Sequence, residues 1–109
     1  MSSVSVVIPA RNEEKHIAKV IELVKKCSLI DEIVVINNNS SDRTAEIATE
    51  AGAKVYLCKK VGKGNAMSLG LKKAKGKYIV FLDSDDMINS KQLNYIVNYA
   101  KKNNLDIVE

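Results

Sequence analysis

The sequence predicts an α/β fold built on a doubly wound, mainly parallel sheet. Three observations predict it: short runs of β-branched apolar residues, helix-period apolar patterns between those runs, and the alternation of the two along the chain. A strand-helix alternation repeated four times favours a parallel sheet with helices on its faces. The 109 residues fit one domain, and 46% apolar residues suffice for a hydrophobic core. We therefore expect a single domain over residues 1–109.

The expected strands are apolar runs that are nearly continuous rather than alternating. Such runs are typical of strands covered on both faces, as in a parallel sheet. The first four consist mainly of Val, Ile and aromatic residues, and the fifth is a weak apolar pair near the last residue. The runs cover residues 4–8, 33–36, 55–57, 78–82 and 107–108.

Two helices are expected in the first half of the chain. Asn12 would cap the first helix, and Glu13 and Glu14 would lie in its first turn, where acidic side chains favour the helix dipole. Ser41 would cap the second helix and Gly52 would end it. The apolar faces of these helices are Ile17, Val20, Ile21 and Val24 for the first, and Ala45, Ile47, Ala48 and Ala51 for the second.

Two further helices are expected in the second half. The third runs from about Lys63 to Ala74 and is followed by Gly76, and the fourth opens at Ser90. Their apolar faces are Met67, Leu71 and Ala74 for the third, and Leu93, Ile96, Val97 and Ala100 for the fourth.

Right-handed crossovers constrain the order of the strands, and the simplest arrangement is 3-2-1-4, with the place of the fifth strand left open. The chain would then reverse direction between strands 1 and 4. Open α/β sheets bind ligands at such a point, beyond the carboxyl ends of the strands. Polar loops follow strands 1, 2 and 4, over residues 9–13, 37–42 and 83–86, and would meet there.

Composition excludes several classes of protein. The net charge is +4, and the basic residues are interleaved with acidic ones, which indicates a solvated surface that mildly favours anionic ligands rather than a nucleic-acid-binding stripe. No apolar run approaches the ~18 residues of a membrane span, and the first residues lack a signal-peptide pattern. Cys27 and Cys58 have no metal-type spacing and are expected to be reduced thiols of a cytoplasmic protein.

The segment Asp83-Ser84-Asp85-Asp86 carries the strongest chemical signal. Three carboxylates within four residues repel one another, and at the end of a buried strand this is costly unless a cation neutralises them. Carboxylate oxygens suit Mg²⁺ or Mn²⁺, which usually share their coordination shell with substrate phosphates. The simpler interpretation is a turn that leads into a helix, where Asp is common.

A second signal is the segment from Val61 to Ala66, which enters the third helix. Its two glycines permit close approach of the backbone, and Lys63 places a positive charge near a helix N-terminus that favours anions. A diphosphate or ribose contact fits, although the segment is neither a P-loop nor a dinucleotide fingerprint. A surface turn with a solvated lysine is the alternative.

The amides of Asn37, Asn38 and Asn39 form a third signal. Side-chain amides both donate and accept hydrogen bonds, as the edge of a nucleotide base does. A turn explains the triplet equally well, because Asn tolerates the left-handed region. Arg11, in the loop after the first strand, suits a phosphate or a base, or simple exposure to solvent.

Taken together, these segments resemble the family 2 glycosyltransferases with the GT-A fold. The resemblance covers nearly the whole chain and leans toward the glucosyl-3-phosphoglycerate synthase and polyprenyl-phosphate sugar transferase branches. Four segments match in order and at sensible spacing: residues 6–14, 36–44, 62–66 and 81–86.

The resemblance implies the binding of a nucleoside-diphosphate sugar through Mg²⁺ or Mn²⁺, with inverting transfer of the sugar to an acceptor. The loops after the first two strands would bind base and ribose, Lys63 the phosphates, Asp83 the ribose, and Asp85 the metal, supported by Asp86. The implied nucleotide-sugar-binding set is Pro9, Ala10, Arg11, Glu13, Asn38, Lys63, Gly64, Asp83 and Ser84, and the implied metal set is Asp85, Asp83 and Asp86.

Two departures from the family pattern matter. Many members carry Asp where this chain has Asn38, which leaves the base of a UDP- or GDP-linked donor open. Members are also substantially longer, and their acceptor site and catalytic base follow the Asp-x-Asp segment. We therefore identify no catalytic residue and expect the base beyond Glu109.

Two other functions remain open at the level of sequence. The chain could be a non-catalytic nucleotide-sugar-binding module that needs another chain to complete its site, or that self-associates through the sheet edge near strand 4. A phosphatase of the haloacid dehalogenase type, with Asp83 as nucleophile, fits poorly. That family wants Thr or Val where this chain has Met87, and it places the motif on its first strand.

Overall fold

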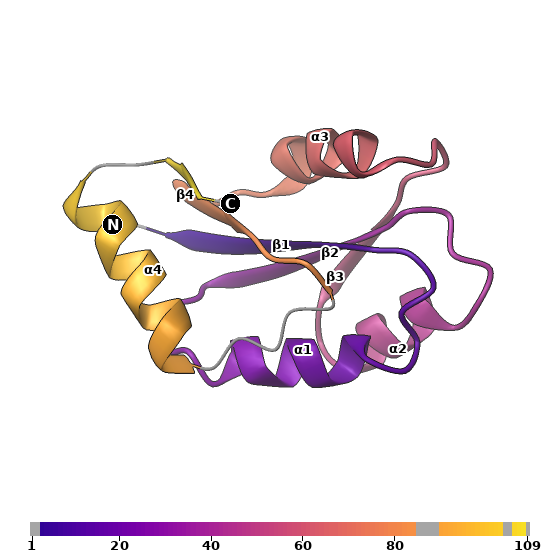
Figure 1. The fold of residues 1–109 in the computed structure, drawn as a ribbon, viewed down its shortest axis with the longest axis horizontal. Helices are drawn as coiled ribbons and strands as arrows, with labels where there is room; N and C mark the ends of the chain where they lie inside the picture. The colour runs from indigo at the N-terminus through magenta and orange to yellow at the C-terminus, as the bar shows by residue number, and fades with distance from the viewer. Residues whose placement is uncertain (1–2, 85–89, 104–105, 109) are drawn as a thin grey trace.

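The computed structural model describes residues 3–84, 90–103 and 106–108. Within them, strands and helices alternate along the chain as the sequence predicts (Figure 1). The strands are β1 (Val4–Ala10), β2 (Glu32–Asn37), β3 (Lys54–Leu57), β4 (Tyr78–Phe81) and β5 (Ile107–Val108). The helices are α1 (Ile17–Lys25), α2 (Thr44–Glu50), α3 (Lys63–Lys73) and α4 (Ser90–Lys102).

The described strands form one parallel sheet in the order β3-β2-β1-β4-β5. The predicted order 3-2-1-4 is confirmed, and the fifth strand joins beside β4. Since every strand points the same way, the carboxyl ends of β1, β2 and β4 lie along one edge of the sheet and the amino ends along the opposite edge. The chain reverses its direction across the sheet between β1 and β4, as predicted.

Helices α1, α2 and α4 cover one face of the sheet, and α3 covers the other (Figure 1). Alternate residues of β1 divide between the two faces: Val6 and Ile8 pack toward α1, whereas Val7 packs toward α3. Central strands β1 and β2 are therefore buried on both faces, as expected. On β3, at the edge of the sheet, Leu57 is 52% exposed, so the expectation of full cover is wrong there.

The predicted apolar face of α3 is wrong in part: Ala74 packs against the buried cluster of this face, as predicted, but Leu71 does not. Leu71 is 41% exposed, and the helix instead packs through Ala66 and Gly70, which are buried. A Cβ on Gly70 would lie 2.5 Å from Cγ1 of Val7, so only glycine lets α3 approach the sheet this closely. The pattern of large apolar residues missed this face because small residues form it.

The predicted caps of α1 and α2 are wrong as well. Helix α1 begins at Ile17 after a turn, so Glu13 and Glu14 precede the helix, and Asn12 has a positive φ of 54°. Helix α2 begins at Thr44, three residues after Ser41. The other predicted ends and faces are confirmed: Gly52 ends α2 with a φ of 100°, and α4 buries Leu93, Val97 and Ala100.

Both cysteines, Cys27 and Cys58, are buried free thiols. Among the residues that the structure describes, no helix is long and apolar enough to cross a membrane.

Candidate functional site

The loops after β1, β2 and β4 meet at the carboxyl edge of the sheet, together with the segment that enters α3. A cavity of about 270 Å³ opens there. Residues from all four segments line it: Pro9, Ala10, Arg11, Asn38, Val61, Gly62, Lys63 and Asp83. The structure thus brings together six of the predicted site residues, which are separated by up to 74 positions in the sequence.

The other predicted site residues lie outside this lining. Gly64 is exposed in the first turn of α3, and Ser84 is 7% exposed directly after Asp83. Glu13 precedes α1, where its carboxylate lies 3.3 Å from Nδ1 of His16. Asp85 and Asp86 fall outside the described residues.

The charged groups of the cavity are Arg11, Lys63 and Asp83. Nζ of Lys63, the first residue of α3, lies 2.9 Å from Oδ1 and 3.1 Å from Oδ2 of Asp83. Both side chains are open to solvent, with 63% of Lys63 and 49% of Asp83 exposed. An exposed ion pair of this kind contributes only about 0–1 kcal/mol to stability. Either partner can therefore be drawn to a ligand at small cost.

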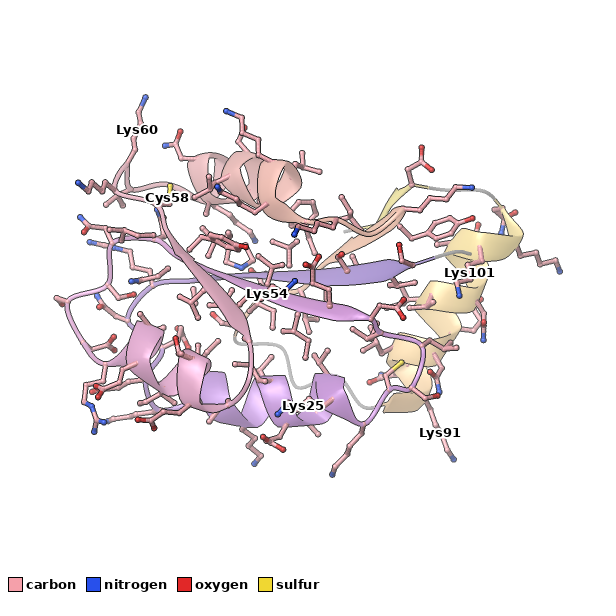
Figure 2. All side chains as sticks on the ribbon, turned by 180° about the vertical axis from the view of Figure 1, so that it is seen from behind. Lys25, Lys54, Cys58, Lys60, Lys91 and Lys101 are labelled. Carbon is pink, nitrogen blue, oxygen red and sulfur yellow. The ribbon has the colours of Figure 1, made fainter. Side chains whose placement is uncertain are left out.

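Asn38 lies beneath the cavity and is only 5% exposed. Its Nδ2 donates to the carbonyl oxygens of Lys60, at 2.9 Å, and Cys58, at 3.3 Å. Its Oδ1 accepts from the backbone N–H of Gly62 at 2.9 Å. Figure 2 shows the Lys60 side chain extending away from the molecule, so this residue meets Asn38 through its backbone alone. The amide thus spends both donors and one acceptor site within the chain.

The neighbouring asparagines form a turn. Oδ1 of Asn37 accepts from the N–H of Ser40 at 3.0 Å, and Asn39 is exposed with a φ of 56°. Of the two interpretations of the triplet, the turn accounts for Asn37 and Asn39.

A set of hydrogen bonds ties the loop after β1 to the loop after β2. Oδ1 of Asn12 accepts from the N–H of Ser41 at 2.8 Å, and the N–H of Glu13 donates to Oγ1 of Thr44 at 2.8 Å. Asp42 accepts from the N–H of Glu14 at 3.2 Å and from the N–H of Thr44 at 2.9 Å. All of these bonds except that from Thr44 to Asp42, which lies within the second loop at the start of α2, hold the two loops together. The polar residues that predicted helix caps therefore mainly form a cross-link between the loops.

Asp42 is held as a carboxylate in this cross-link. Desolvation alone would raise its pKa, but the hydrogen bonds from Thr44 and from the N–H of Glu14 outweigh that effect and lower the pKa below its usual range. The cross-link therefore stays intact in neutral solution.

The sequence analysis missed Val61 and Gly62 as residues of the cavity wall. Gly62 has a φ of 138°, a backbone conformation that residues with a side chain rarely adopt. Gly62 could have been predicted from its position next to Lys63, within a segment already singled out for its glycines.

The donor chemistry of the cavity fits Mg²⁺ or Mn²⁺ in part. The Asp83 carboxylate at the cavity wall supplies hard oxygen ligands of the kind these ions prefer. Residues 3–84, 90–103 and 106–108 contain no cluster of three or more metal-binding side chains, and the remaining predicted ligands, Asp85 and Asp86, lie outside this part of the chain.

Comparison with known proteins assigns the family. The sequence model of glycosyl transferase family 2 matches residues 5–108. The chain belongs to this family. The resemblance inferred from the sequence is thereby confirmed, and it spans the strands, the helices and the carboxyl-edge loops.

Two curated relatives show how much of a whole family member the chain represents. It is 40% identical over 96 residues to 4,4'-diaponeurosporenoate glycosyltransferase from Staphylococcus haemolyticus, a match that covers 82% of this chain and 26% of the relative. It is 36% identical over 106 residues to Protein RfbJ from Shigella flexneri, covering 97% of this chain and 82% of that protein. The chain thus spans about a quarter of the first relative's length and most of the second's.

A solved structure confirms the GT-A fold, and it comes from one of the branches that the sequence resembles. Glucosyl-3-phosphoglycerate synthase from Mycobacterium tuberculosis, crystallised with Mn²⁺, UDP and glucosyl-3-phosphoglycerate, superposes with a TM-score of 0.79 at 31% sequence identity. The match covers 89% of this chain and 39% of the synthase. The match therefore includes most of the sheet and its helices, whose connecting loops line the cavity in this chain.

Proposed function

We propose that this family 2 chain binds a nucleoside-diphosphate sugar together with Mg²⁺ or Mn²⁺ at the carboxyl edge of its sheet, as the donor-binding part of an inverting glycosyltransferase. The observation that carries the proposal is the cavity that gathers Arg11, Lys63 and Asp83 from three separate loops. A related synthase that binds UDP and Mn²⁺ has the same fold, which supports the assignment.

The cationic side chains of the cavity are suited to the diphosphate. Lys63 lies at the N-terminus of α3, where the helix dipole adds to its own positive charge. Arg11 is exposed, also lines the cavity, and presents planar N–H donors that match phosphate oxygens. Pro9 and Ala10 add apolar surface to the lining, against which a base or ribose would pack.

Asp83 would meet the ribose and, with Asp85 and Asp86, hold the metal. When bound, the divalent ion supplies Lewis-acid stabilisation of the charge that builds on the departing diphosphate. The chain's own part is to hold the donor. Lys63 would leave Asp83 for the phosphates, an exchange made easy by the exposure of their ion pair.

Inverting transfer also needs a general base that takes the proton of the acceptor hydroxyl. None of the residues that line the cavity has that role in our proposal. We therefore expect the isolated chain to bind donor and to transfer sugar poorly or not at all.

Calorimetry tests the donor site. UDP and GDP should each be titrated with Mn²⁺, with Mg²⁺ and with a chelator, and we expect at least one of them to bind only when a divalent ion is present. Asp83→Asn should weaken that binding by about tenfold or more, since it removes a charged ligand. The matched control is Asp106→Asn, because Asp106 is exposed beside β5 and its backbone carbonyl, which pairs with Ile79, is unchanged.

Absence of any metal-dependent binding of UDP or GDP by the wild-type chain would overturn the proposal. Equal losses in Asp83→Asn and Asp106→Asn would show that the cavity is not the binding site. Sugar transfer by the chain alone would overturn only the expectation that the residues lining the cavity supply no base.

A further inference from the structure

We infer that Asn38 is a positioning residue: it fixes the segment of residues 58–62 and thereby places Lys63 in the cavity, rather than reading the nucleotide base. The inference rests on the proposed donor site and assigns one of its residues a different role. In the family likeness, the loop that contains Asn38 would contact base and ribose, and that role is the alternative to be tested.

The first argument is the number of bonds that the amide makes within the chain. Nδ2 donates to the carbonyl oxygens of Cys58 and Lys60, and Oδ1 accepts from Gly62 N–H. Both donors of the amide are used, and one lone pair of Oδ1 remains. A base that needs a donor from this position would have to displace a bond to a largely buried group, at a cost of about 1–3 kcal/mol.

The second argument is how few and how long the other side-chain bonds to the segment are. Residues 59–61 lie between β3 and α3 and are exposed, so neither the sheet ladder nor a helix holds them. The segment ends at Gly62, whose φ of 138° suits glycine, the residue with the greatest backbone freedom. Apart from Asn38, side chains reach residues 59–61 through a bond from Sγ of Cys58 to the Lys60 carbonyl at 3.4 Å and one from Nδ2 of Asn65 to the Val61 carbonyl at 3.3 Å. The Asn38 amide makes three bonds to the segment, two of them at 2.9 Å, and the next residue is Lys63.

The third argument concerns how Asn38 itself is fixed. Its backbone N–H donates to the carbonyl of Ala10 at 2.8 Å, which joins the end of β2 to the end of β1. Nearby, the N–H of Cys58 donates to the carbonyl of Asn37 at 2.8 Å. Asn38 is therefore anchored in the sheet and spans from the cavity floor at Ala10 to the entrance of α3.

The donors of the amide explain why asparagine suits this place. Carbonyl oxygens of Cys58 and Lys60 require hydrogen-bond donors, and a carboxylate has none. An aspartate here would put a negative charge beside two acceptors and would keep only the bond from the Gly62 N–H. Asn38→Asp should thus loosen the segment even though the two side chains have nearly the same shape.

The test compares three ligands in the presence of Mn²⁺: UDP, GDP and inorganic pyrophosphate. A positioning residue acts through Lys63 and the phosphates, so Asn38→Asp and Asn38→Ala should weaken all three by the same factor, about tenfold for the loss of neutral hydrogen bonds. A base-reading residue would change the ratio of UDP to GDP affinity and leave pyrophosphate binding unaltered. That second result would overturn the inference.

A measurement without ligand keeps the inference testable on its own. Amide hydrogen exchange at Gly62 should quicken by at least about tenfold in Asn38→Ala, because the N–H loses its acceptor. The matched control is Asn39→Gly, in the same triplet, which suits the positive φ of Asn39 and leaves the Asn38 side chain unchanged. Unchanged exchange at Gly62 in a folded Asn38→Ala chain would overturn the inference. Failure of the wild type to bind any ligand would instead count against the proposed donor site.

Discussion

The two edges of the sheet have cavities of similar volume, but their carboxylate side chains differ in exposure and in hydrogen bonding. At the amino edge, a cavity of about 210 Å³ is lined by Asp31 and Glu32 among others, and at the carboxyl edge the cavity is about 270 Å³. The Glu32 side chain is only 9% exposed, whereas Asp83 at the other edge is 49% exposed. The two cavities differ little in volume, but the carboxylate at the amino edge is largely buried and the one at the carboxyl edge is half exposed.

Glu32 at the amino edge is satisfied by the chain itself. Its Oε1 accepts from Oγ of Ser5 at 2.6 Å and from the N–H of Lys75 at 2.9 Å, and its Oε2 pairs with Nζ of Lys54 at 2.8 Å. Oγ of Ser5 in turn accepts from the N–H of Gly76 at 2.9 Å. This network joins β1, β2, β3 and the turn before β4, and it engages both carboxylate oxygens of Glu32.

The carboxyl edge is arranged the other way. Its Lys63–Asp83 pair is exposed and adds little to stability, so its charges remain exchangeable. The comparison teaches that the Glu32 carboxylate at the amino edge is used to hold the sheet together, whereas the charges at the carboxyl edge stay available for the donor that we propose. Changes at the amino edge should alter unfolding and spare binding, and changes at the carboxyl edge should do the reverse.

The largest effect is expected from Glu32→Ala at the amino edge. The change leaves the buried hydroxyl of Ser5 and the N–H of Lys75 without their acceptor, which should lower the free energy of unfolding by about 2–3 kcal/mol. Urea unfolding followed by circular dichroism measures this loss. Affinity for UDP with Mn²⁺, measured where the variant is folded, should stay within about twofold of the wild type, a change of under roughly 0.5 kcal/mol.

The control for that prediction is Glu46→Ala, the same substitution at an exposed ion pair. Oε2 of Glu46 lies 2.9 Å from Nε of Arg43, with both side chains more than half exposed. Its removal should cost no more than about 0.5 kcal/mol. If both variants lost the same stability, or if Glu32→Ala weakened UDP binding, the proposed division between the two edges would fail.

A smaller effect, of the opposite kind, is expected from Lys63→Gln at the carboxyl edge. Loss of the ammonium should weaken UDP binding in the presence of Mn²⁺ by about tenfold or more, since a charge-assisted contact to phosphate contributes at least roughly 1.5 kcal/mol. Stability should change by less than about 1 kcal/mol. Mn²⁺ alone should bind no more weakly than to wild type, because Asp83 is relieved of a competing cation.

Lys72→Gln is the matched control, because Lys72 is an exposed lysine in the last turn of the same helix. It should leave UDP binding unchanged. Weakening by both variants alike would mean that the net charge of the chain, and not the place of Lys63, governs the affinity.

The sequence predicted the sheet better than the helices that cover it. Continuous β-branched runs gave the strands, and the crossover rule gave their order, because both depend on local pattern and chain handedness. The packing face of α3 was missed, since Gly70 reaches the sheet by lacking a side chain. The caps of α1 and α2 were missed because Asn12 and Ser41 bond to each other across loops that are 29 positions apart.

The place of the candidate site was predictable for the same reason as the strand order. Once the order is set, the loops after β1, β2 and β4 must share an edge, and the cavity there contains Arg11, Lys63 and Asp83. Partnership within the edge was not predictable. Whether the Asn38 amide faces a ligand or the backbone of residues 58–62 depends on the path of the loop before α3. That path leaves no periodic pattern in the sequence, unlike a helix or a strand.

The smallest expected effect is the pH dependence of the stability that Glu32 contributes at the amino edge. Burial alone would raise the pKa of Glu32, but the hydrogen bonds from Lys54, Lys75 and Ser5 outweigh it and lower the pKa below its ordinary value of 4.5. A carboxylate whose pKa is lowered on folding stabilises the native chain fully above the unfolded pKa. That contribution is lost as the pH falls through the folded pKa.

Glu32→Gln cannot titrate at this position, so its stability should depend less on pH than that of the wild type below about pH 4.5. Unfolding by urea at about pH 7 and about pH 3 measures the difference between the two proteins, which should shrink at the lower pH as Glu32 takes up its proton. The shift must be smaller than the loss in Glu32→Ala, because a protonated or amide side chain keeps an acceptor for Ser5 and Lys75. A difference that stays constant with pH would show that the network is held by its shape alone, and the amino edge would then owe its stability to packing rather than to the charge of Glu32.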